Sequence, residues 1–302
     1  MPRGARTWGV FAGIVLIWGT TWHAIVYQLA HTTPAFGVAV RFGLASLLVL
    51  GWCAWRGDRL RLGRADHLRL AVQGAFMYSV SYLCVYHAEK HVPSGLVAVG
   101  YSASPLLMGL GGWLLWRTPL TGRFVLGGVM GILGVALIFW PEFARATAGE
   151  GTALGALFTA GAVLLSGVGS LIASRNRAEG LPFWPALGYG MGYSALLSLA
   201  FVVADGQAVH WPAAPSWWLS LGYLTIAGSV MAFAGYLWLQ QRIGIGPTAT
   251  VGVATPVLAL IVSTAFEGFV PTWPTLAGAA LAIVGNGLAL GIGAGVDSGP
   301  PA

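Results

Sequence analysis

Residues 95–107, GLVAVGYSASPLL, decide the fold of this chain, because residues 246–258, GPTATVGVATPVL, repeat their pattern 151 positions later. The same shift continues without a gap to Gly134 and Gly285, with nine identical positions in forty. Composition alone would give about four. A second pair of segments, AGIVLIWG at 12–19 and AGAVLLSG at 160–167, repeats as well. The chain is therefore predicted to be an internal duplication.

The composition indicates a membrane protein. Of the 302 residues 8% are charged and 57% hydrophobic, whereas a soluble domain carries about a quarter charged residues. Apolar segments of about twenty residues, long enough to cross about 30 Å of hydrocarbon as helices, follow one another almost without pause. Ten spans are predicted, at residues 7–28, 34–55, 67–88, 94–116, 121–140, 152–174, 182–204, 216–239, 246–267 and 273–293.

Basic residues gather on one side of these spans. With the N-terminus in the cytoplasm, the outside connections hold only Lys90 and Arg145, and positive charge is normally kept on the cytoplasmic side. The sequence therefore predicts a multi-pass protein of the bacterial inner membrane with both termini cytoplasmic. The inside connections hold Arg3, Arg6, Arg56, Arg59, Arg61, Arg64, Arg69, Arg117, Arg123, Arg175, Arg177 and Arg242.

An odd number of spans per half makes the two halves point in opposite directions. We expect an all-α membrane protein whose ten transmembrane helices form two inverted five-helix repeats, residues 1–140 and 152–293. Residues 141–151 connect them, and the Gly/Pro-rich tail 294–302 is expected to be disordered. Inverted repeats are a signature of secondary transporters, which expose a midplane site to each side in turn.

Other classes of protein are disfavoured. The net charge of +6 lies in connections and forms no basic face, so no nucleic-acid partner is expected. Cys53 and Cys84 lie inside apolar spans and imply no disulfide framework. Arg3 and Arg6 before an apolar run could begin a signal peptide, but no small-residue cleavage site follows and residues 160–167 repeat the segment. A retained first helix is expected.

Matched helix breaks locate the expected site. Pro105 and Pro256 stand near mid-span of equivalent helices, where each removes a backbone hydrogen bond and frees a carbonyl. Gly19 and Gly167 form a second matched pair. Proline and glycine also serve packing in membrane helices, but two symmetric pairs favour functional hinges near the bilayer midplane.

Several motifs carry a family resemblance: Gly19-Thr20-Thr21, Pro34…Arg41-Phe42…Ala45, Val92-Pro93-Ser94-Gly95-Leu96…Pro105, and Gly246…Pro256…Glu267. With these motifs the chain resembles the drug/metabolite transporter superfamily and, within it, the EamA group. The resemblance implies ten helices, a cavity formed by helices 1, 3, 4, 6, 8 and 9, and secondary transport, mostly export of amino acids or other small metabolites. One departure is Trp116-Arg117-Thr118, where the family often carries a carboxylate. The resemblance therefore implies no gate or coupling carboxylate at this position of the first half.

Arg41 and Glu267 are candidates for a gate. Arg41 lies about 10 Å below the outer end of the second helix, a depth at which a cation is costly unless it is paired, hydrated or snorkelled. Two interpretations stay open: a snorkelling arginine that sets helix depth, or a pair with Glu267 that closes the outer end. Glu267, for its part, could be a solvated charge at a helix end.

The histidines give weaker signals. His23, five residues from the outer end of the first helix, is a candidate proton relay, although a hydrogen-bonded packing histidine is commoner. His87 and His91 have a metal-ligand spacing, but HAEKH matches neither zinc-protease order, so we expect an interfacial loop and neither a metal nor a cofactor. The bilayer centre holds no carboxylate, so export without proton coupling fits the sequence.

Aromatic side chains predict the wall of the cavity. They recur every four residues along one side of the third helix, ending at Tyr86, and of the first helix, and Tyr101 lies one turn before Pro105. A Tyr hydroxyl near the bilayer centre needs a partner, which disfavours a lipid-facing position. Interface belts and helix packing are the alternative, above all for Tyr86. The predicted substrate-binding residues are Trp18, Trp22, Tyr78, Tyr82, Tyr101, Ser166, Ser229 and Phe233.

Two small-residue stripes have the spacing of close helix packing, Gly127-x-x-x-Gly131 in the fifth helix and Gly287-x-x-x-Gly291 in the tenth. They favour a buried pair of helices. Homodimerisation through the same stripes is the competing interpretation.

The predicted function is export of an amino acid or similarly small zwitterion by alternating access, with the lipid bilayer as the other partner. Aromatic walls would hold its apolar part, and hydroxyls and freed carbonyls near Pro105 and Pro256 its polar part. A carbohydrate or nucleotide-sugar carrier is the alternative, although it would want more Asn, Gln and charged donors at mid-span. An enzyme is not expected, because no catalytic constellation appears at compatible depth. A purely structural membrane protein would not require matched helix breaks.

Overall fold

The computed structural model describes residues 3–117, 121–144, 149–206, 210–244, 248 and 250–289, and these residues contain helices but no strand. Seven helical segments are long and apolar enough to cross a membrane, and three shorter apolar helices accompany them. Large apolar side chains such as Leu47, Trp55 and Val203 are exposed on the outside of the molecule. Such a surface suits hydrocarbon rather than water, so the chain is a multi-pass membrane protein. The predicted disordered tail 294–302 lies outside the described residues.

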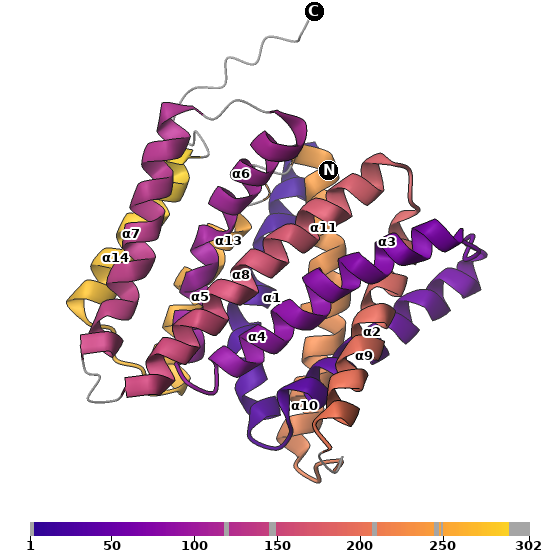
Figure 1. Cartoon of the computed structure of the whole chain (residues 1–302), viewed down its shortest axis with the longest axis horizontal. Coiled ribbons are helices and arrows are strands. Elements are labelled where there is room, and N and C mark those ends of the chain that lie inside the picture. The colour runs from indigo at the N-terminus through magenta and orange to yellow at the C-terminus, as the bar shows by residue number, and fades with distance from the viewer. Residues whose placement is uncertain are drawn as a thin grey trace, which may run out of the picture.

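The helices follow the predicted spans with few differences (Figure 1). Within the expected connection 141–151, the described residues 141–144 end α7 and residues 149–151 begin α8; α7 continues through Pro141, because a proline in the last turn removes only one backbone hydrogen bond. In chain order the elements are α1 (Arg3–Leu29), α2 (Pro34–Arg56), α3 (Arg64–Gly74), η1 (Ala75–Val80), α4 (Ser81–Ala88), α5 (Ser94–Gly100), η2 (Tyr101–Ala103), α6 (Ser104–Trp116), α7 (Gly122–Ala144), α8 (Gly149–Ala178), α9 (Phe183–Ala204), α10 (Pro215–Tyr223), η3 (Leu224–Met231), α11 (Ala232–Ile243), α13 (Val251–Phe266) and α14 (Trp273–Ala289).

The helix irregularities only partly match the predicted breaks. A 3₁₀ turn, η2, directly precedes Pro105, but α13 continues through Pro256. α1 and α8 pass unbroken through Gly19 and Gly167, so neither helix is interrupted there, and a hinge role for the two glycines stays a prediction. Gly19 serves close packing, because an added Cβ would lie 2.6 Å from the Leu258 side chain, whereas at Gly167 an added Cβ would make an ordinary contact of 3.4 Å with Leu107.

Two π-helical segments, η1 and η3, interrupt the third and eighth spans. They begin at residues 75 and 224, a separation of 149 that differs from the sequence shift by only two residues. A π-helical turn adds a residue to the helix and turns the following side chains to a new direction, which is why such turns often mark functional sites. The sequence patterns did not predict these segments.

Helices from the two halves pack on one another: α2 on α9, α1 on α13, α4 on α8, and α7 on α14 at the left edge of Figure 1. The α7–α14 contact is made by glycines, since a Cβ added to Gly134 would lie 2.6 Å from the carbonyl oxygen of Gly278. One added to Gly285 would lie 2.6 Å from the carbonyl oxygen of Gly127. The fifth-helix stripe is thus buried within the chain.

The tenth-helix stripe is predicted at the wrong glycines. Gly278 and Gly285, seven residues or two turns apart, share the face that meets α7, whereas an added Cβ at Gly287 meets no atom within 4 Å. Gly287 is two residues after Gly285 and so points to another side of the helix. Gly291 lies outside the described residues.

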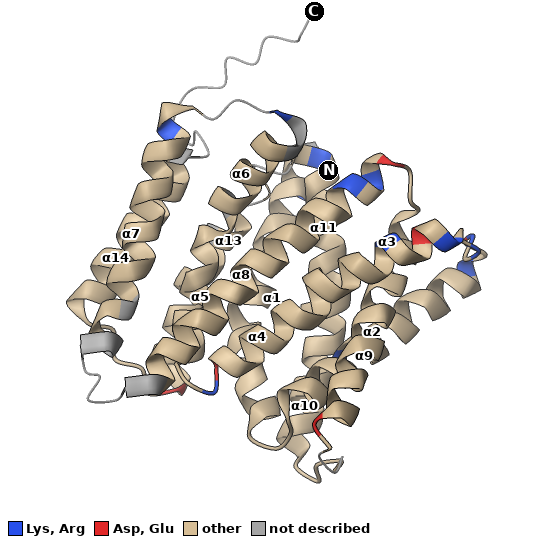
Figure 2. Ribbon diagram, viewed as in Figure 1, with Lys and Arg blue, Asp and Glu red and all other residues tan. Residues whose placement is uncertain are grey.

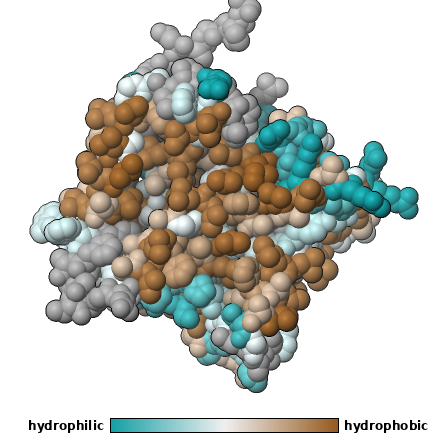
Figure 3. All heavy atoms as spheres, in the orientation of Figure 1, coloured by the Kyte–Doolittle hydropathy of each residue, from teal (hydrophilic) through white to brown (hydrophobic). Residues whose placement is uncertain are grey.

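The two ends of the molecule differ in charge. Lys and Arg gather at one end of the bundle, here called the basic end, which holds the connections with Arg59, Arg61, Arg117, Arg175 and Arg242 (Figure 2). The opposite end holds residues 89–93 and 267–272. Between hydrophilic patches at the upper right and the bottom, apolar side chains cover the face in Figure 3. The arrangement is that of helices crossing a hydrocarbon layer between two polar surfaces.

Candidate functional site

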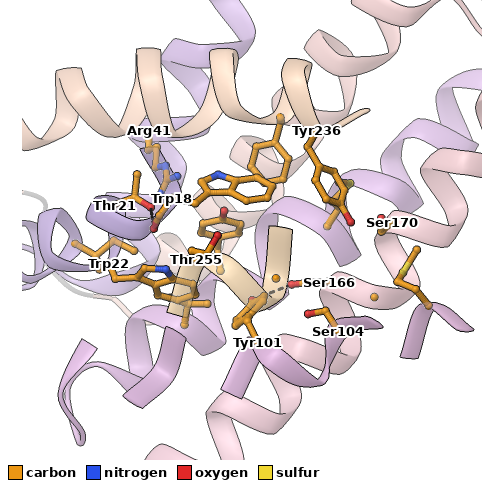
Figure 4. Close-up of a pocket in the computed structure, with 18 residues that line it drawn as sticks. Trp18, Thr21, Trp22, Arg41, Tyr101, Ser104, Ser166, Ser170, Tyr236 and Thr255 are labelled. Carbon is orange, nitrogen blue, oxygen red and sulfur yellow. Dashed lines mark hydrogen bonds between the residues drawn. The ribbon is translucent and has the colours of Figure 1, made fainter. Parts of the chain in front are cut away.

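A cavity of about 110 Å³ lies between helices of the two halves (Figure 4). This is the liquid volume of about three to four water molecules and less than ordinary ligand pockets enclose, so a larger ligand requires the walls to separate. The lining residues are Trp18, Thr21, Trp22, Ile25, Arg41, Met77, Tyr82, Val85, Tyr101, Ser104, Met108, Ser166, Gly167, Ser170, Phe233, Tyr236, Gly252 and Thr255. They come from helices 1, 3, 4, 6, 8 and 9 of the predicted spans, with Arg41 added from helix 2.

Six of the eight predicted substrate-binding residues line this cavity: Trp18, Trp22, Tyr82, Tyr101, Ser166 and Phe233. Tyr78 and Ser229 do not, and both belong to the π-helical segments. Tyr78 is buried behind the wall, with its ring 4.8 Å from that of Phe233. Ser229 lies behind the lining residues, where its hydroxyl accepts a hydrogen bond from Arg41 Nε. Binding of substrate by the six residues stays a prediction.

Aromatic rings pack edge to face or at a tilt to form the wall. The ring of Trp18 lies 5.2 Å from those of both Phe233 and Tyr236, and Trp22 lies 5.1 Å from Tyr101. Two of the polar groups on this wall already have partners. Trp18 Nε1 donates to the carbonyl of Gly228 at 3.2 Å, and the Tyr101 hydroxyl lies 2.9 Å from Ser166 Oγ. The wall is therefore apolar over most of its area.

Three other polar groups of the cavity are buried without a hydrogen-bond partner among the described residues: Arg41 Nη1, Trp22 Nε1 and Thr255 Oγ1. Figure 4 shows their side chains around the same space. Buried donors without partners are costly, and native proteins almost always satisfy them. Two N–H donors and one hydroxyl in an aromatic cavity are groups of the kind that hydrogen-bond an acceptor such as a carboxylate.

Arg41 is 1% exposed, so it does not snorkel to the outer surface. Its Nε donates to Ser229 Oγ at 2.9 Å, and Ser229 Oγ in turn donates to the carbonyl of Leu224 at 2.9 Å. The guanidinium carbon lies 4.8 Å from the ring centre of Tyr82. The π-helical segment η3 thus holds the guanidinium, and the side chain points into the cavity.

Glu267 binds a different set of groups from the one predicted. Its carboxylate accepts hydrogen bonds from Ser94 N at 3.1 Å, from the Ser94 hydroxyl and from Ser263 Oγ at 3.0 Å, and it lies 3.0 Å from His23 Nδ1. Burial alone would raise the pKa of the Glu267 carboxyl, but the hydrogen bonds from Ser94, His23 and Ser263 outweigh it and lower the pKa.

The predicted ion pair between Arg41 and Glu267 is therefore not formed among the described contacts. Glu267 already accepts hydrogen bonds from Ser94 and Ser263 and lies against His23, and Arg41 is anchored by Ser229. His23, the predicted proton relay, is the histidine partner of Glu267 and is not among the residues that line the cavity. A gate role for Arg41 and Glu267 stays a prediction, as does proton relay by His23.

A second buried carboxylate escaped the sequence analysis. Glu89 caps α4, and both of its carboxylate oxygens are buried without a hydrogen-bond partner in the described part of the chain. Burial raises the pKa of this carboxyl well above its ordinary value, the charge of Glu267 raises it further, and Arg41 lowers it. The sequence placed Glu89 in an interfacial loop, HAEKH, because charged residues at the end of a span are usually solvated. His87 and His91 of the same segment stack on Phe158.

Comparisons with known proteins agree with a transporter. A family model described as the EamA-like transporter family matches the chain twice, at residues 7–140 and 153–291. The chain is 25% identical over 287 residues to an uncharacterized transporter, YvbV, of Bacillus subtilis, covering 94% of this chain and 90% of that one. It is also 25% identical to an uncharacterized inner membrane transporter, YedA, of Escherichia coli, covering 86% and 82%. A solved crystal structure shares the fold at 20% identity, with a TM-score of 0.68 over 94% and 96% of the two chains.

Proposed function

Because the chain belongs to the EamA-like transporter family, we propose that it exports amino acids or similarly small zwitterions across the bacterial inner membrane by alternating access. The single observation that carries the choice of cargo is the aromatic cavity with three unpartnered polar groups. The flat rings suit an apolar side chain, and Arg41 Nη1 with Trp22 Nε1 suits a carboxylate. A carbohydrate would leave most of its hydroxyls facing these rings without partners.

Several observations support ten helices in two inverted repeats. The family model matches each half separately, and the π-helical segments fall at nearly equivalent positions. The shift of 151 exchanges Gly127 with Gly278 and Gly134 with Gly285, so it converts the Gly127–Gly285 contact into the Gly134–Gly278 contact. Such an exchange is expected for helices related by a two-fold axis between α7 and α14. Two similar bundles related in this way can rock about a midplane cavity.

Polar contacts close the cavity toward each end. Toward the opposite end, Glu267 joins His23 of α1 to Ser94 of α5. Toward the basic end, Gln240 Nε2 donates to Ser170 Oγ at 2.9 Å. Ser170 lines the central cavity, and Gln240 lines a second cavity of about 270 Å³ beside Arg177. In the proposed cycle one set of contacts separates while the other holds, with the basic end in the cytoplasm.

Export of labelled amino acids from cells that overexpress the chain tests this proposal. Trp22→Phe keeps an aromatic ring but removes the Nε1 donor, and it should lower the export rate about tenfold, the value of one lost hydrogen bond to a charged group. Trp55→Phe, the same substitution at a side chain that is 82% exposed, is the matched control and should leave export unchanged. Wild-type cells that export none of the amino acids faster than cells without the chain would contradict the proposed cargo, and equal rates for both variants would contradict the proposed site.

A further inference from the structure

Glu89 lies on the face of α4 that meets Arg41. Tyr82, Tyr86 and Glu89 are separated by four and three residues and so follow one another along one side of the helix. Tyr82 at the start of this row lies under the guanidinium of Arg41, and Tyr86 is fully buried. Glu89 ends the row one turn further from the cavity, where the charge of Arg41 reaches its carboxylate. Both carboxylate oxygens of Glu89 and Nη1 of Arg41 are thus buried without a partner among the described residues, and Glu89 lies on the side of α4 that carries Tyr82, the ring beneath Arg41.

No carboxylate of the described residues forms an ion pair with Arg41. Its Nε is bonded to a neutral hydroxyl, its Nη1 has no partner among the described residues, and Glu267 is bonded to other groups. The Tyr86 hydroxyl and Gln28 Oε1 are also buried without described partners, and both side chains border Gly37. A buried cation is stable only when an anion or several dipoles compensate it. Two anions can do so here: the Glu89 carboxylate and the carboxylate of a ligand in the cavity.

We propose that Glu89 is a proton-binding site that competes with the bound ligand for Arg41. When Glu89 is ionised it neutralises Arg41, and when Glu89 takes up a proton from solvent it leaves Arg41 Nη1 free for the ligand's carboxylate. Binding of one carboxylate is thereby linked to uptake of one proton. This inference rests on the proposed function, because it needs a carboxylate cargo.

The surroundings of Glu89 favour this exchange. Burial and the neighbouring charge of Glu267 raise the pKa of Glu89, while Arg41 opposes that shift. A ligand carboxylate that engages Arg41 removes the opposing effect and so makes Glu89 easier to protonate. The charged and titratable groups around Glu89 are Arg41 of α2, Glu267 after α13 with its partner His23 of α1, Tyr101 of η2, and His87, Tyr86 and Lys90 on its own segment.

Linkage predicts how affinity depends on pH. With one proton bound per ligand, affinity falls about tenfold for each pH unit over the range in which Glu89 ionises. Glu89→Gln mimics the protonated state, so its affinity should not fall over that range. At low pH the two proteins should bind equally, and at high pH the wild type should bind at least tenfold more weakly.

Calorimetric titration of the purified full chain in detergent micelles measures this directly, from pH 5 to pH 9. The probes are L-leucine and L-phenylalanine, each beside its carboxamide, which lacks the charge that Arg41 recognises. The ratio of wild-type to Glu89→Gln affinity cancels the titration of the probe's own amino group. Glu179→Gln, a carboxylate at the basic end that binds Arg69 and Arg175, is the control and should follow the wild type. Repeating the wild-type titration in buffers of different ionisation enthalpy gives the number of protons taken up per bound probe, and this measurement needs no variant.

The proposal is supported if the ratio of wild-type to Glu89→Gln affinity falls as pH rises. It also requires that the wild type take up one proton per bound amino acid and none per bound carboxamide. A ratio that stays constant from pH 5 to pH 9, or zero protons taken up, overturns the linkage and leaves the proposed transport of amino acids intact. Wild type that binds neither amino acid at any pH overturns the proposed cargo itself, and the linkage falls with it.

Discussion

Glu89 and Glu267 both lie at the end of the molecule away from the basic end, but the surroundings of their carboxylates differ. Glu267 accepts hydrogen bonds from Ser94 and Ser263 and lies against His23, whereas the carboxylate of Glu89 has no described partner. The pKa of Glu267 is lowered and that of Glu89 is raised. Two carboxylates near each other in a buried place rarely ionise together, and the one with hydrogen-bond donors keeps the charge. The comparison separates a structural carboxylate, Glu267, from one that is free to exchange a proton, Glu89.

The largest expected effect tests the structural side of this comparison. Glu267→Ala should lower the free energy of unfolding by about 3 kcal/mol, because it leaves the Ser94 N–H, two hydroxyls and His23 without their acceptor in a place where the carboxylate is only 12% exposed. Unfolding of the purified protein in detergent micelles at neutral pH measures the loss.

Glu179→Ala is the matched control for that experiment. Glu179 forms ion pairs with Arg69 and Arg175 but lies at the surface, where water screens the charges, so its loss should destabilise the protein much less than Glu267→Ala does. Equal losses for the two variants would mean that the contacts of Glu267 add nothing beyond a surface ion pair.

A smaller effect, opposite in sign for the two glutamates, appears in the pH dependence of stability. Because the folded chain holds a proton on Glu89 that the unfolded chain has lost, stability should fall as pH rises from the ordinary glutamate pKa to the raised one, by up to about 1.4 kcal/mol per pH unit. Glu267 contributes stability above the ordinary glutamate pKa, and this contribution is lost as pH falls through its lowered pKa. Unfolding measured across a pH series should therefore show losses at both ends.

The variants assign each loss to its residue. Glu89→Gln should remove the loss at high pH and keep the loss at low pH, and at neutral pH it should be at least as stable as the wild type. If Glu89→Gln has the same pH profile as the wild type, Glu89 is not the buried proton-binding carboxyl and the contrast with Glu267 disappears.

The smallest effect comes from one donor of Glu267. Ser94→Ala removes the hydroxyl but keeps the backbone N–H that also binds the carboxylate, so the loss should be about 1 kcal/mol. The pKa of Glu267 should move back toward its ordinary value, so the acid loss of stability should begin at a higher pH. Ser46→Ala, which removes one hydroxyl donor to the carbonyl of Gly188 far from any carboxylate, should show a similar loss without the change in acid profile. An unchanged acid profile in Ser94→Ala would assign the lowered pKa of Glu267 to its other partners.

Part of the cavity was predictable from local patterns. Trp18, Trp22 and Tyr82 recur at helical spacing, and an aromatic residue with a polar atom near the bilayer centre belongs on an inner face. The same rule failed at Tyr78, because the π-helical segment η1 turns its side chain behind the wall. No composition rule marks a π-helical turn, since it depends on what the helix packs against.

Contacts between distant residues were the hardest to predict. The pairing of Arg41 with Glu267 followed from charge and depth alone, and those features do not say which hydroxyls and imidazoles reach each group first. Glu89 was overlooked for the same reason, because its burial is created by residues far away in the sequence.

The sequence by itself determined that the chain crosses a membrane as apolar helices, because span length and hydropathy are local properties that hydrocarbon thickness selects directly. The duplicated pattern and the family match were likewise readable without coordinates. Only the tertiary structure decided which of the few buried charged side chains have hydrogen-bond partners. Desolvation and hydrogen bonding depend on atoms within a few ångströms, whatever their separation along the chain, and Ser94, Ser229 and His23 reach their partners from more than 170 residues away.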